Sequence, residues 1–316
     1  MKLNKVHTII TEKIIAALEA GVVPWRKPWA GGAASPQNLI SKRPYSGINV
    51  LLLSMTAAEK GFTSPYWLTK NQVLAAGGAF KPGQEPYAPA TFDEDGVVVR
   101  AEIGNNRNAA LVSFWGTFGK KKTTTLRSTV NGADVDRDAG PRFFKYFLVW
   151  NIEQTTGLDA LVPAPVTSTP VAPDVAAEAI VAGYPHGPTL DHTSGAAWYR
   201  PSTDHVGLPP RDSFTDTVAY YATVFHELVH STGHESRLKR FAQGAALGKG
   251  SEVYSKEELV AEMGAAFLGA EAGLPDNLEQ NAAYIRSWLT VLRDDHGFVI
   301  SAASQAQKAT DHILGR

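Results

Sequence analysis

Apolar residues recur at helical spacing in several stretches of this chain. Residues 4–20 place apolar side chains on one helical face ahead of Gly21, so this segment is predicted to form an amphipathic helix; the apolar positions include Ile9, Ile10, Ile14 and Leu18. The same spacing predicts further helices at 69–76, 174–183, 215–234, 255–272, 284–294 and 302–314.

Alternation of apolar and polar residues predicts β-strands in both halves of the chain. The clearest strand is 143–154, which is rich in aromatic residues, and shorter ones are expected at 97–103, 110–118, 197–199 and 205–208. Segment 205–208 ends before two prolines and is interpreted as an edge strand that could align an extended peptide. The apolar run 45–55 is short enough to be a buried helix or a strand, and its periodicity does not decide between them.

Four prolines among small and hydroxyl residues mark the stretch 159–176. Proline suppresses both helix and sheet, so we predict a semi-rigid linker there. The linker separates a domain at 1–158 from a domain at 177–316. The second domain has a few short strands followed by helices, and the mixture in both halves predicts the α+β fold class.

The amino-acid composition limits the kinds of covalent link and metal ligand that this chain can have. The chain has no cysteine, so disulfides are excluded and any metal ion must be held by His and carboxylate side chains. No run of residues has the length and apolarity of a membrane span, and the N-terminal stretch lacks the apolar core of a signal peptide, so we expect a cytoplasmic protein without a membrane partner.

Charge is distributed unevenly between the two halves. Residues 1–160 carry 19 Lys and Arg against 13 Asp and Glu, whereas residues 161–316 carry 11 against 18. A basic first half suggests a polyanionic partner for that half and a different role for the acidic half.

The predicted helix 215–234 contains the pattern H-E-x-x-H, formed by His226, Glu227 and His230. Four residues advance a helix by about 6 Å, so both imidazoles reach one side and can bind one metal ion. Glu227 lies beside them and can take a proton from water, which makes it the predicted catalytic residue. The expected helix boundaries are Asp212 or Ser213 at the start and Gly233 at the end.

Catalytic zinc sites use a third protein ligand, and three residues are candidates. Glu258 and Glu262 share one face of the next predicted helix, and we favour Glu258 as the ligand and Glu262 as its hydrogen-bonding support. His234 would extend the motif by one turn, but Gly233 is expected to end the helix before it. Ser255 and Glu258 also match a capping box, in which case Glu262 would be the ligand.

The expected ion is Zn²⁺, with another divalent cation such as Mn²⁺ as the alternative. A zinc ion would polarise a scissile carbonyl, and the developing oxyanion would need one more donor. A tyrosine hydroxyl could supply it, although each candidate also fits a packing role; the candidates are Tyr220, Tyr221 and Tyr254.

Aromatic and basic residues gather in the first half. Five of the 7 tryptophans precede residue 151. Single-stranded nucleic acid is bound by stacking its bases on aromatic side chains in a positive groove, so we predict such a site, with core packing as the alternative for each aromatic residue. The candidate contacts are Trp25, Arg26, Lys27, Trp29, Arg43, Tyr45, Tyr66 and Trp67.

Several longer motifs resemble the ArdC-type antirestriction proteins over nearly the whole chain. In the first half, the N-terminal domain of that family is matched by PWRKPW (24–29), RPYSGINVLLL (43–53), SPYWLTKNQV (64–73), FKPGQ (80–84) and FLVWNIEQTTGL (147–158). In the second half, its zincin-type metallopeptidase domain is matched by LPPRDSF (208–214), YYATVFHELVHSTGHESRLKR (220–240) and YSKEELVAEMGAAFL (254–268).

The resemblance implies a plasmid- or phage-borne protein that binds single-stranded DNA and protects incoming DNA from host restriction enzymes. A protein substrate, such as a DNA-bound or restriction protein, is the further expected partner. Two alternatives remain open. One is a metalloprotease that clears proteins bound or crosslinked to DNA, and the other is a DNA-coating module whose metal ion is structural.

Overall fold

A mixed four-stranded sheet organises the first half of the protein, seen in a computed structural model that describes residues 2–21, 23, 35–86, 108–117, 129–130, 133–134, 142–163, 173–241, 252–274 and 282–316. The strand order is β1-β2-β7-β4, with β1 and β2 parallel and the other pairs antiparallel. The strands are β1 (Gln37–Asn38), β2 (Tyr66–Thr69), β4 (Ala110–Thr117) and β7 (Arg142–Asn151). The predicted strand 110–118 is confirmed as β4. The predicted strand 143–154 is confirmed as β7 up to Asn151, after which Ile152–Gln154 form a 3-10 turn. The predicted strand 97–103 lies outside the described residues.

The ambiguous apolar run 45–55 contributes to a helix, α2 (Ile48–Lys60). Glycines with positive φ bound this helix, Gly47 at 57° and Gly61 at 71°, a backbone conformation that other residues adopt only at a cost. Helix α2 packs on β4, and its Asn49 side chain bonds both the N–H and the C=O of Ser113 on this edge strand. These bonds satisfy backbone groups that an edge strand would otherwise expose.

The second half begins with a three-stranded sheet of order β10-β11-β9, formed by β9 (Thr189–Asp191), β10 (Trp198–Arg200) and β11 (His205–Gly207). Strand β11 is the middle strand, antiparallel to β10 and parallel to β9. The interpretation of 205–208 as an edge strand is therefore wrong. Strand β11 pairs with β10 on one side and, on the other, with β9, a strand that the sequence did not predict.

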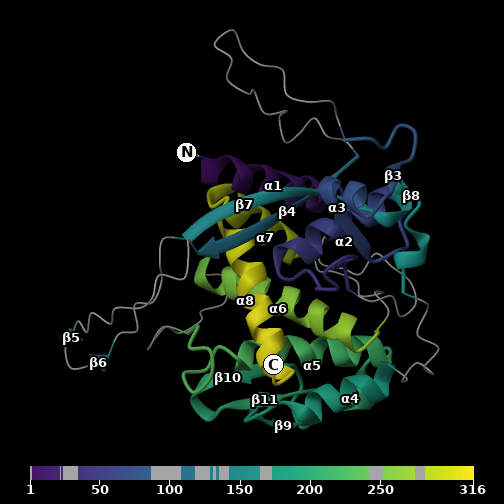
Figure 1. Ribbon diagram of the computed structural model, residues 1–316. Coiled ribbons are helices and arrows are strands. Elements are labelled where there is room, and N and C mark those ends of the chain that lie inside the picture. The colour runs from purple at the N-terminus through teal and green to yellow at the C-terminus, as the bar shows by residue number, and fades with distance from the viewer. Residues whose placement is uncertain are drawn as a thin grey trace.

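Helices make up most of the remainder, and Figure 1 shows α8 running from the four-stranded sheet towards the three-stranded one. The helices are α1 (Lys2–Glu19), α3 (Lys70–Ala75), α4 (Pro173–Gly183), α5 (Thr217–Ser231), α6 (Glu252–Glu271), α7 (Ala282–Asp294) and α8 (Phe298–Ile313). The short strands pair as β3 (Ala79–Phe80) with β8 (Thr155–Thr156) and β5 (Thr129–Val130) with β6 (Ala133–Asp134). This mixture of helices and sheets confirms the α+β class.

One apolar core joins elements of both halves. Side chains of α1 and α2 belong to the same buried cluster as those of α5, α6 and α8; the contributors include Ile10, Ile14, Leu51, Phe225, Leu259 and Ala303. Polar contacts cross the same junction, from Thr11 Oγ1 to the His296 carbonyl at 2.7 Å and from the Gly47 N–H to Gln307 Oε1 at 3.1 Å. The two predicted domains thus pack against each other over a continuous core, and their boundary remains a prediction.

The predicted linker 159–176 is described only at its ends. Residues Asp159–Leu161 form a 3-10 turn, and α4 begins at Pro173, so the last residues assigned to the linker are helical. Proline is favourable in the first turn of a helix, where its missing N–H has no intrahelical partner. Among the helices in the described part of the chain, none is both long and apolar enough to span a membrane.

Candidate metal centre

Helix α5 carries the H-E-x-x-H pattern on a well-capped frame. Asp216, rather than Asp212 or Ser213, caps the helix, because its Oδ1 accepts the N–H of Ala219 at 2.8 Å. The helix ends at Ser231, and Gly233 follows in a turn. A Cβ at Gly233 would lie 2.5 Å from the Phe241 ring, so glycine is needed here for a close approach of the chain.

His226, His230 and Glu258 converge between α5 and α6, with one ligand atom from each within 4.8 Å of the others. The two Nε2 atoms are 3.0 Å apart. Glu258 directs Oε2 to His226 Nε2 and Oε1 to His230 Nε2, both at 3.4 Å. Figure 1 shows the two parent helices side by side, which is how residues 28 positions apart in the chain meet.

These distances fit a divalent cation. An ion bound tetrahedrally at about 2.0–2.1 Å from its nitrogen ligands separates the ligand atoms by about 3.3–3.4 Å. The observed separations of 3.0, 3.4 and 3.4 Å match that edge length with little adjustment. Two imidazoles and one carboxylate also form a donor set that suits Zn²⁺ and accepts Mn²⁺.

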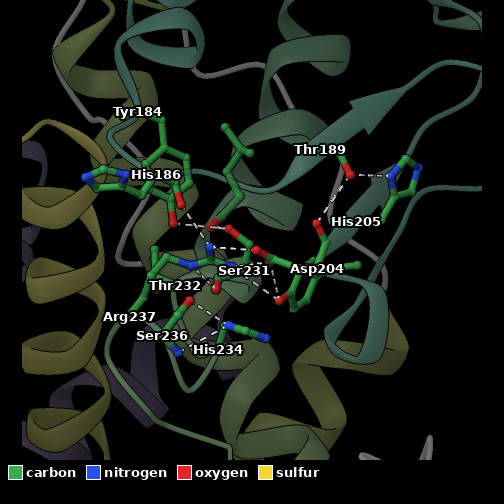
Figure 2. Close-up of polar contacts among 12 residues, drawn as sticks. Tyr184, His186, Thr189, Asp204, His205, Ser231, Thr232, His234, Ser236 and Arg237 are labelled. Carbon is green, nitrogen blue, oxygen red and sulfur yellow. Dashed lines mark hydrogen bonds and ion pairs between the residues drawn. The ribbon is translucent and has the colours of Figure 1, made fainter.

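The three candidates for the third ligand lie at different places around the two imidazoles. Helix α6 begins at Glu252, so Ser255 lies inside the helix and the capping-box reading of Glu258 is wrong. Glu262 lies on the outer side of His226, with Oε1 3.4 Å from Nδ1. His234 lies beyond the end of α5, where its Nδ1 is 2.7 Å from Ser236 Oγ (Figure 2). Glu258 alone of the three faces both Nε2 atoms.

A second buried carboxylate, Glu257, was not anticipated from the sequence. Its Oε1 lies 3.5 Å from His230 Nδ1, and Arg240 forms a two-pronged ion pair with it at 2.6 and 3.1 Å. Each imidazole thus has a carboxylate at the nitrogen that faces away from the centre. Glu257 precedes Glu258 in the sequence, but its contact with His230 could not be predicted there, because it depends on the position of Arg240 in the fold.

Opposing effects set the protonation of the centre. Burial alone would lower the pKa of His226, but hydrogen bonds to Glu258 and Glu262, together with the charge of Glu227, raise it well above its ordinary value. The pKa of His230 is likewise raised, because Glu257 and Glu258 outweigh its burial. Burial would raise the pKa of Glu258, but the two imidazoles lower it far below its ordinary value.

These shifts predict opposite pH trends for the metal-free and the metal-loaded protein. The folded metal-free protein holds the proton of His226 more tightly than the unfolded chain does. This stabilisation is complete below the unfolded pKa of about 6.5 and is lost as pH rises through the raised folded pKa. Ion binding requires deprotonated rings, so the apparent affinity should instead rise with pH.

Thermal melts with and without Zn²⁺ between pH 6 and pH 8.5, a range of about 2.5 pH units around these transitions, check both trends. His226→Gln, which has no titrating ring at this position, should make the metal-free curve less steep and leave the slope that His230 contributes. Parallel pH trends in the two states of the wild type would contradict the assignment of His226.

Glu227 is buried in α5, with 8% of its surface exposed, between the two imidazole-bearing residues in the chain. Two of the three tyrosines considered as oxyanion donors, Tyr220 and Tyr221, have hydrogen-bond partners away from the two imidazoles. The Tyr221 hydroxyl donates to Glu178 Oε1 at 2.6 Å and accepts from Arg211 at 2.7 Å, and the Tyr220 hydroxyl is 2.9 Å from His192 Nε2. These bonds favour the packing interpretation of both residues.

Arg237 fastens the end of α5 to the three-stranded sheet. Its buried guanidinium pairs with both oxygens of Asp204 and also donates to the carbonyls of Ser231 and His186 (Figure 2). Tyr199 on β10 accepts a further bond from Arg237 and donates to Asp204 at 2.9 Å. Arg237 therefore holds the end of α5 against the three-stranded sheet. None of these bonds involves either imidazole.

The structure describes only some of the residues predicted to contact single-stranded DNA. Trp25, Arg26, Lys27 and Trp29 lie outside the described residues. Arg43 is exposed, and Tyr45 and Tyr66 are half-buried near β1, with Lys42 Nζ 5.7 Å from the centre of the Tyr66 ring.

Trp67 is a core residue, and its assignment as a DNA contact is wrong. Only 1% of its surface is exposed, and its ring meets Phe62 edge-on at 6.0 Å between centroids. Tyr66 and Trp67 are neighbours on β2, so their side chains point to opposite faces, and Trp67 points into the cluster that contains Leu53 and Val149.

Two further aromatic residues, outside the set predicted to contact DNA, are exposed on the four-stranded sheet. Phe114 on β4 and Phe147 on β7 have 55% and 46% of their surface exposed. Phe147 pairs with Val112 across the ladder, and Phe114 lies two residues beyond Val112, so both rings share one face as diagonal neighbours. Val112 and Val149 share this face but are buried, so only the part that bears the two phenylalanines is exposed, which the strand pattern did not predict.

Two family models match this chain, one in each half. The N-terminal domain of the anti-restriction factor ArdC matches residues 4–150. A zincin-like metallopeptidase model matches residues 176–305, which contain the candidate metal centre described above.

Two crystal structures of the antirestriction ArdC protein from plasmid R388 are similar along nearly the whole chain. The Mn(II)-bound structure is 31% identical with a TM-score of 0.70, covering 98% of this chain and 97% of that one. The metal-free structure has the same identity and a TM-score of 0.69, covering 98% and 96%. The zincin-like match and the Mn(II)-bound relative indicate a divalent metal ion.

Relatives in sequence include much longer proteins. Two Escherichia coli proteins named DNA primase TraC are 35% and 34% identical over 98% of this chain, which spans only 20% and 27% of their lengths. The uncharacterized protein y4eC of Sinorhizobium fredii is 31% identical, covering 97% of this chain and 90% of that protein.

Proposed function

Because the chain belongs to the ArdC antirestriction family, we propose that it protects incoming plasmid or phage DNA from host restriction enzymes in the cytoplasm. In this proposal the first half binds single-stranded DNA and the second half carries a metal-dependent peptidase-type centre. The observation that carries it is the convergence of His226, His230 and Glu258 in a chain whose similarity to ArdC extends over both halves.

Zn²⁺ is the ion we propose for the centre, held by the two Nε2 atoms and the Glu258 carboxylate. The separations of these atoms support tetrahedral binding, and zinc prefers that geometry. Mn²⁺ is the alternative, in view of the Mn(II)-bound relative. Elemental analysis of the protein purified without chelators distinguishes the two ions.

The residues of the chain provide the remaining parts of a peptide hydrolysis site. A divalent ion bound there would polarise a carbonyl and make water more acidic. Glu227, buried next to His226, is positioned along the chain to take the proton from the attacking water and to return it to the leaving amine. The substrate we propose is a protein associated with the incoming DNA.

Exposed aromatic side chains on the four-stranded sheet support binding of single-stranded DNA. Phe114 and Phe147 offer adjacent ring surfaces on one face of the sheet, and the half-buried Tyr66 offers a ring beside the Lys42 cation on the opposite face. Bases stack on such rings without sequence preference, and basic residues bind the phosphates. The surplus of Lys and Arg over Asp and Glu in residues 1–160 is consistent with this partner.

Replacing Phe114 or Phe147 by alanine should weaken binding of a single-stranded oligonucleotide. Loss of one stacking ring costs about 1–3 kcal/mol, which is about 5- to 150-fold in affinity. Fluorescence anisotropy with a labelled oligonucleotide at several salt concentrations measures this effect. The slope of affinity against salt should stay as in the wild type, because these rings carry no charge.

Leu74→Ala provides the matched control, since Leu74 on α3 is 54% exposed but has no ring. It should bind DNA as the wild type does. Unchanged binding after loss of both phenylalanines would remove this face of the sheet from the DNA site.

A further inference from the structure

The buried carboxylate of Glu257 addresses the nitrogen of His230 that faces away from the proposed metal centre. Its Oε1 is 3.5 Å from His230 Nδ1, whereas His230 Nε2 faces His226 and Glu258. An imidazole can present Nε2 to a cation only when the proton resides on Nδ1. A carboxylate that accepts a hydrogen bond from Nδ1 therefore selects the tautomer and the ring orientation that metal binding needs.

Arg240 fixes Glu257 in this position. The Arg240 side chain is 7% exposed, and its Nε and Nη2 donate to the two oxygens of Glu257 at 3.1 and 2.6 Å. The same guanidinium donates to Thr232 Oγ1 at 2.5 Å and to the Val229 carbonyl at 2.8 Å. Arg240 thus ties the last turn of α5 to the beginning of α6, the two helices that supply the proposed ligands.

The positive charge of Arg240 is also what permits Glu257 to be buried. An isolated carboxylate is very costly to bury, but a two-pronged pair with arginine offsets much of that cost. His226 has a looser arrangement, because the side chain of its outer carboxylate, Glu262, is 27% exposed, against 9% for Glu257. The two imidazoles are therefore supported unequally, and the support of His230 depends on a residue nine positions after Ser231.

We propose that Arg240 and Glu257 are a positioning pair that orients His230 for metal binding. Through Arg240, the segment that follows α5 would then set the ion affinity of the centre. This inference rests on the proposed metal centre. Neither residue contacts the ion or the substrate in this arrangement, and both act through the ring of His230.

The test uses Glu257→Gln and Arg240→Lys in the full-length chain. Ion affinity is measured by competition with a chelating indicator, with Zn²⁺ and with Mn²⁺ as separate probes. Each substitution should weaken binding about 10- to 100-fold, the range found for carboxylates that support a ligating histidine. In ¹⁵N spectra of the loaded protein, the Nδ1–H signal of His230 should be present in the wild type and broadened or shifted in Glu257→Gln.

Arg237→Lys is the matched control, because Arg237 lies in the same segment, its side chain is 2% exposed, and it pairs with both oxygens of Asp204. It should lower the melting temperature while leaving ion affinity unchanged. The proposed positioning role would be overturned if folded Glu257→Gln and Arg240→Lys bound the ion as tightly as the wild type. It would also be overturned if Arg237→Lys lost as much ion affinity as these two variants. A wild type that binds neither ion would instead overturn the proposed metal centre itself.

Discussion

Glu258→Gln is expected to abolish tight binding of a divalent ion. Glu258 is 3% exposed and faces both Nε2 atoms at 3.4 Å, whereas Glu257 and Glu262 lie at the Nδ1 atoms of the two rings. Glutamine keeps the shape but removes the charge that binds the cation. The loss of ion affinity should be larger than the loss of about 10- to 100-fold expected for a carboxylate that only supports a ligating histidine. The wild type at an ion concentration about 1,000 times its Kd gains about 4 kcal/mol of stability, and the variant should gain none.

Calorimetric titration and thermal melts with added Zn²⁺ measure both effects, and two substitutions serve as controls. Glu262→Gln should weaken binding only about 10-fold, because Glu262 contacts the outer nitrogen of His226. His234→Ala should have no effect, since His234 is bonded to Ser236 beyond the end of α5. Loss of binding in Glu262→Gln with full binding in Glu258→Gln would transfer the ligand role to Glu262.

The sequence was sufficient to predict the paired imidazoles, and the reason is local. A four-residue spacing places His226 and His230 on one side of any regular helix, whatever surrounds it. Glu258 was harder to assign, because its role depended on where the next helix begins. A start at Ser255 would have made Glu258 a cap, whereas the observed start at Glu252 leaves it free to face the two imidazoles.

Other parts of the site depend on contacts that no local pattern encodes. Arg240 reaches Glu257 because the chain turns back after α5, where the Phe241 ring packs closely on Gly233 and Arg237 binds Asp204. The strand patterns likewise predicted β4 and β7, but not β2 and not which residues on each face are covered. Trp67 of β2 is buried in one cluster with Val149 of β7, while Phe147 and Phe114, on the same face of the sheet, remain exposed.

The continuous core also bears on function. Alternation and helical spacing predicted separate elements on either side of a proline-rich stretch, yet α1 and α2 share a core with α5, α6 and α8. The Gly47 N–H, which follows the candidate DNA residues Arg43 and Tyr45, binds Gln307 of α8. DNA held at the first half would therefore lie at a fixed position relative to the metal centre, as hydrolysis of a DNA-associated protein requires.

Glu227→Gln is expected to abolish peptidase-type activity while leaving the ion and DNA in place. Glutamine has the shape of the buried glutamate but cannot accept the proton of the attacking water, and loss of a positioned general base costs about 10²- to 10⁴-fold in rate. His226, His230 and Glu258 are unchanged, so the Kd for Zn²⁺ should remain that of the wild type. Affinity for a single-stranded oligonucleotide should also be unchanged, because Glu227 is buried in α5.

The decisive measurement is transfer of unmodified plasmid DNA into restricting cells that express either protein at equal levels. If hydrolysis underlies protection, Glu227→Gln should lose it although it still binds DNA. Full protection by Glu227→Gln would show that coating of the DNA suffices and that the ion is structural. Degradation of a DNA-bound protein by the wild type alone, with equal protection by both, would assign the centre to clearing such proteins rather than to antirestriction.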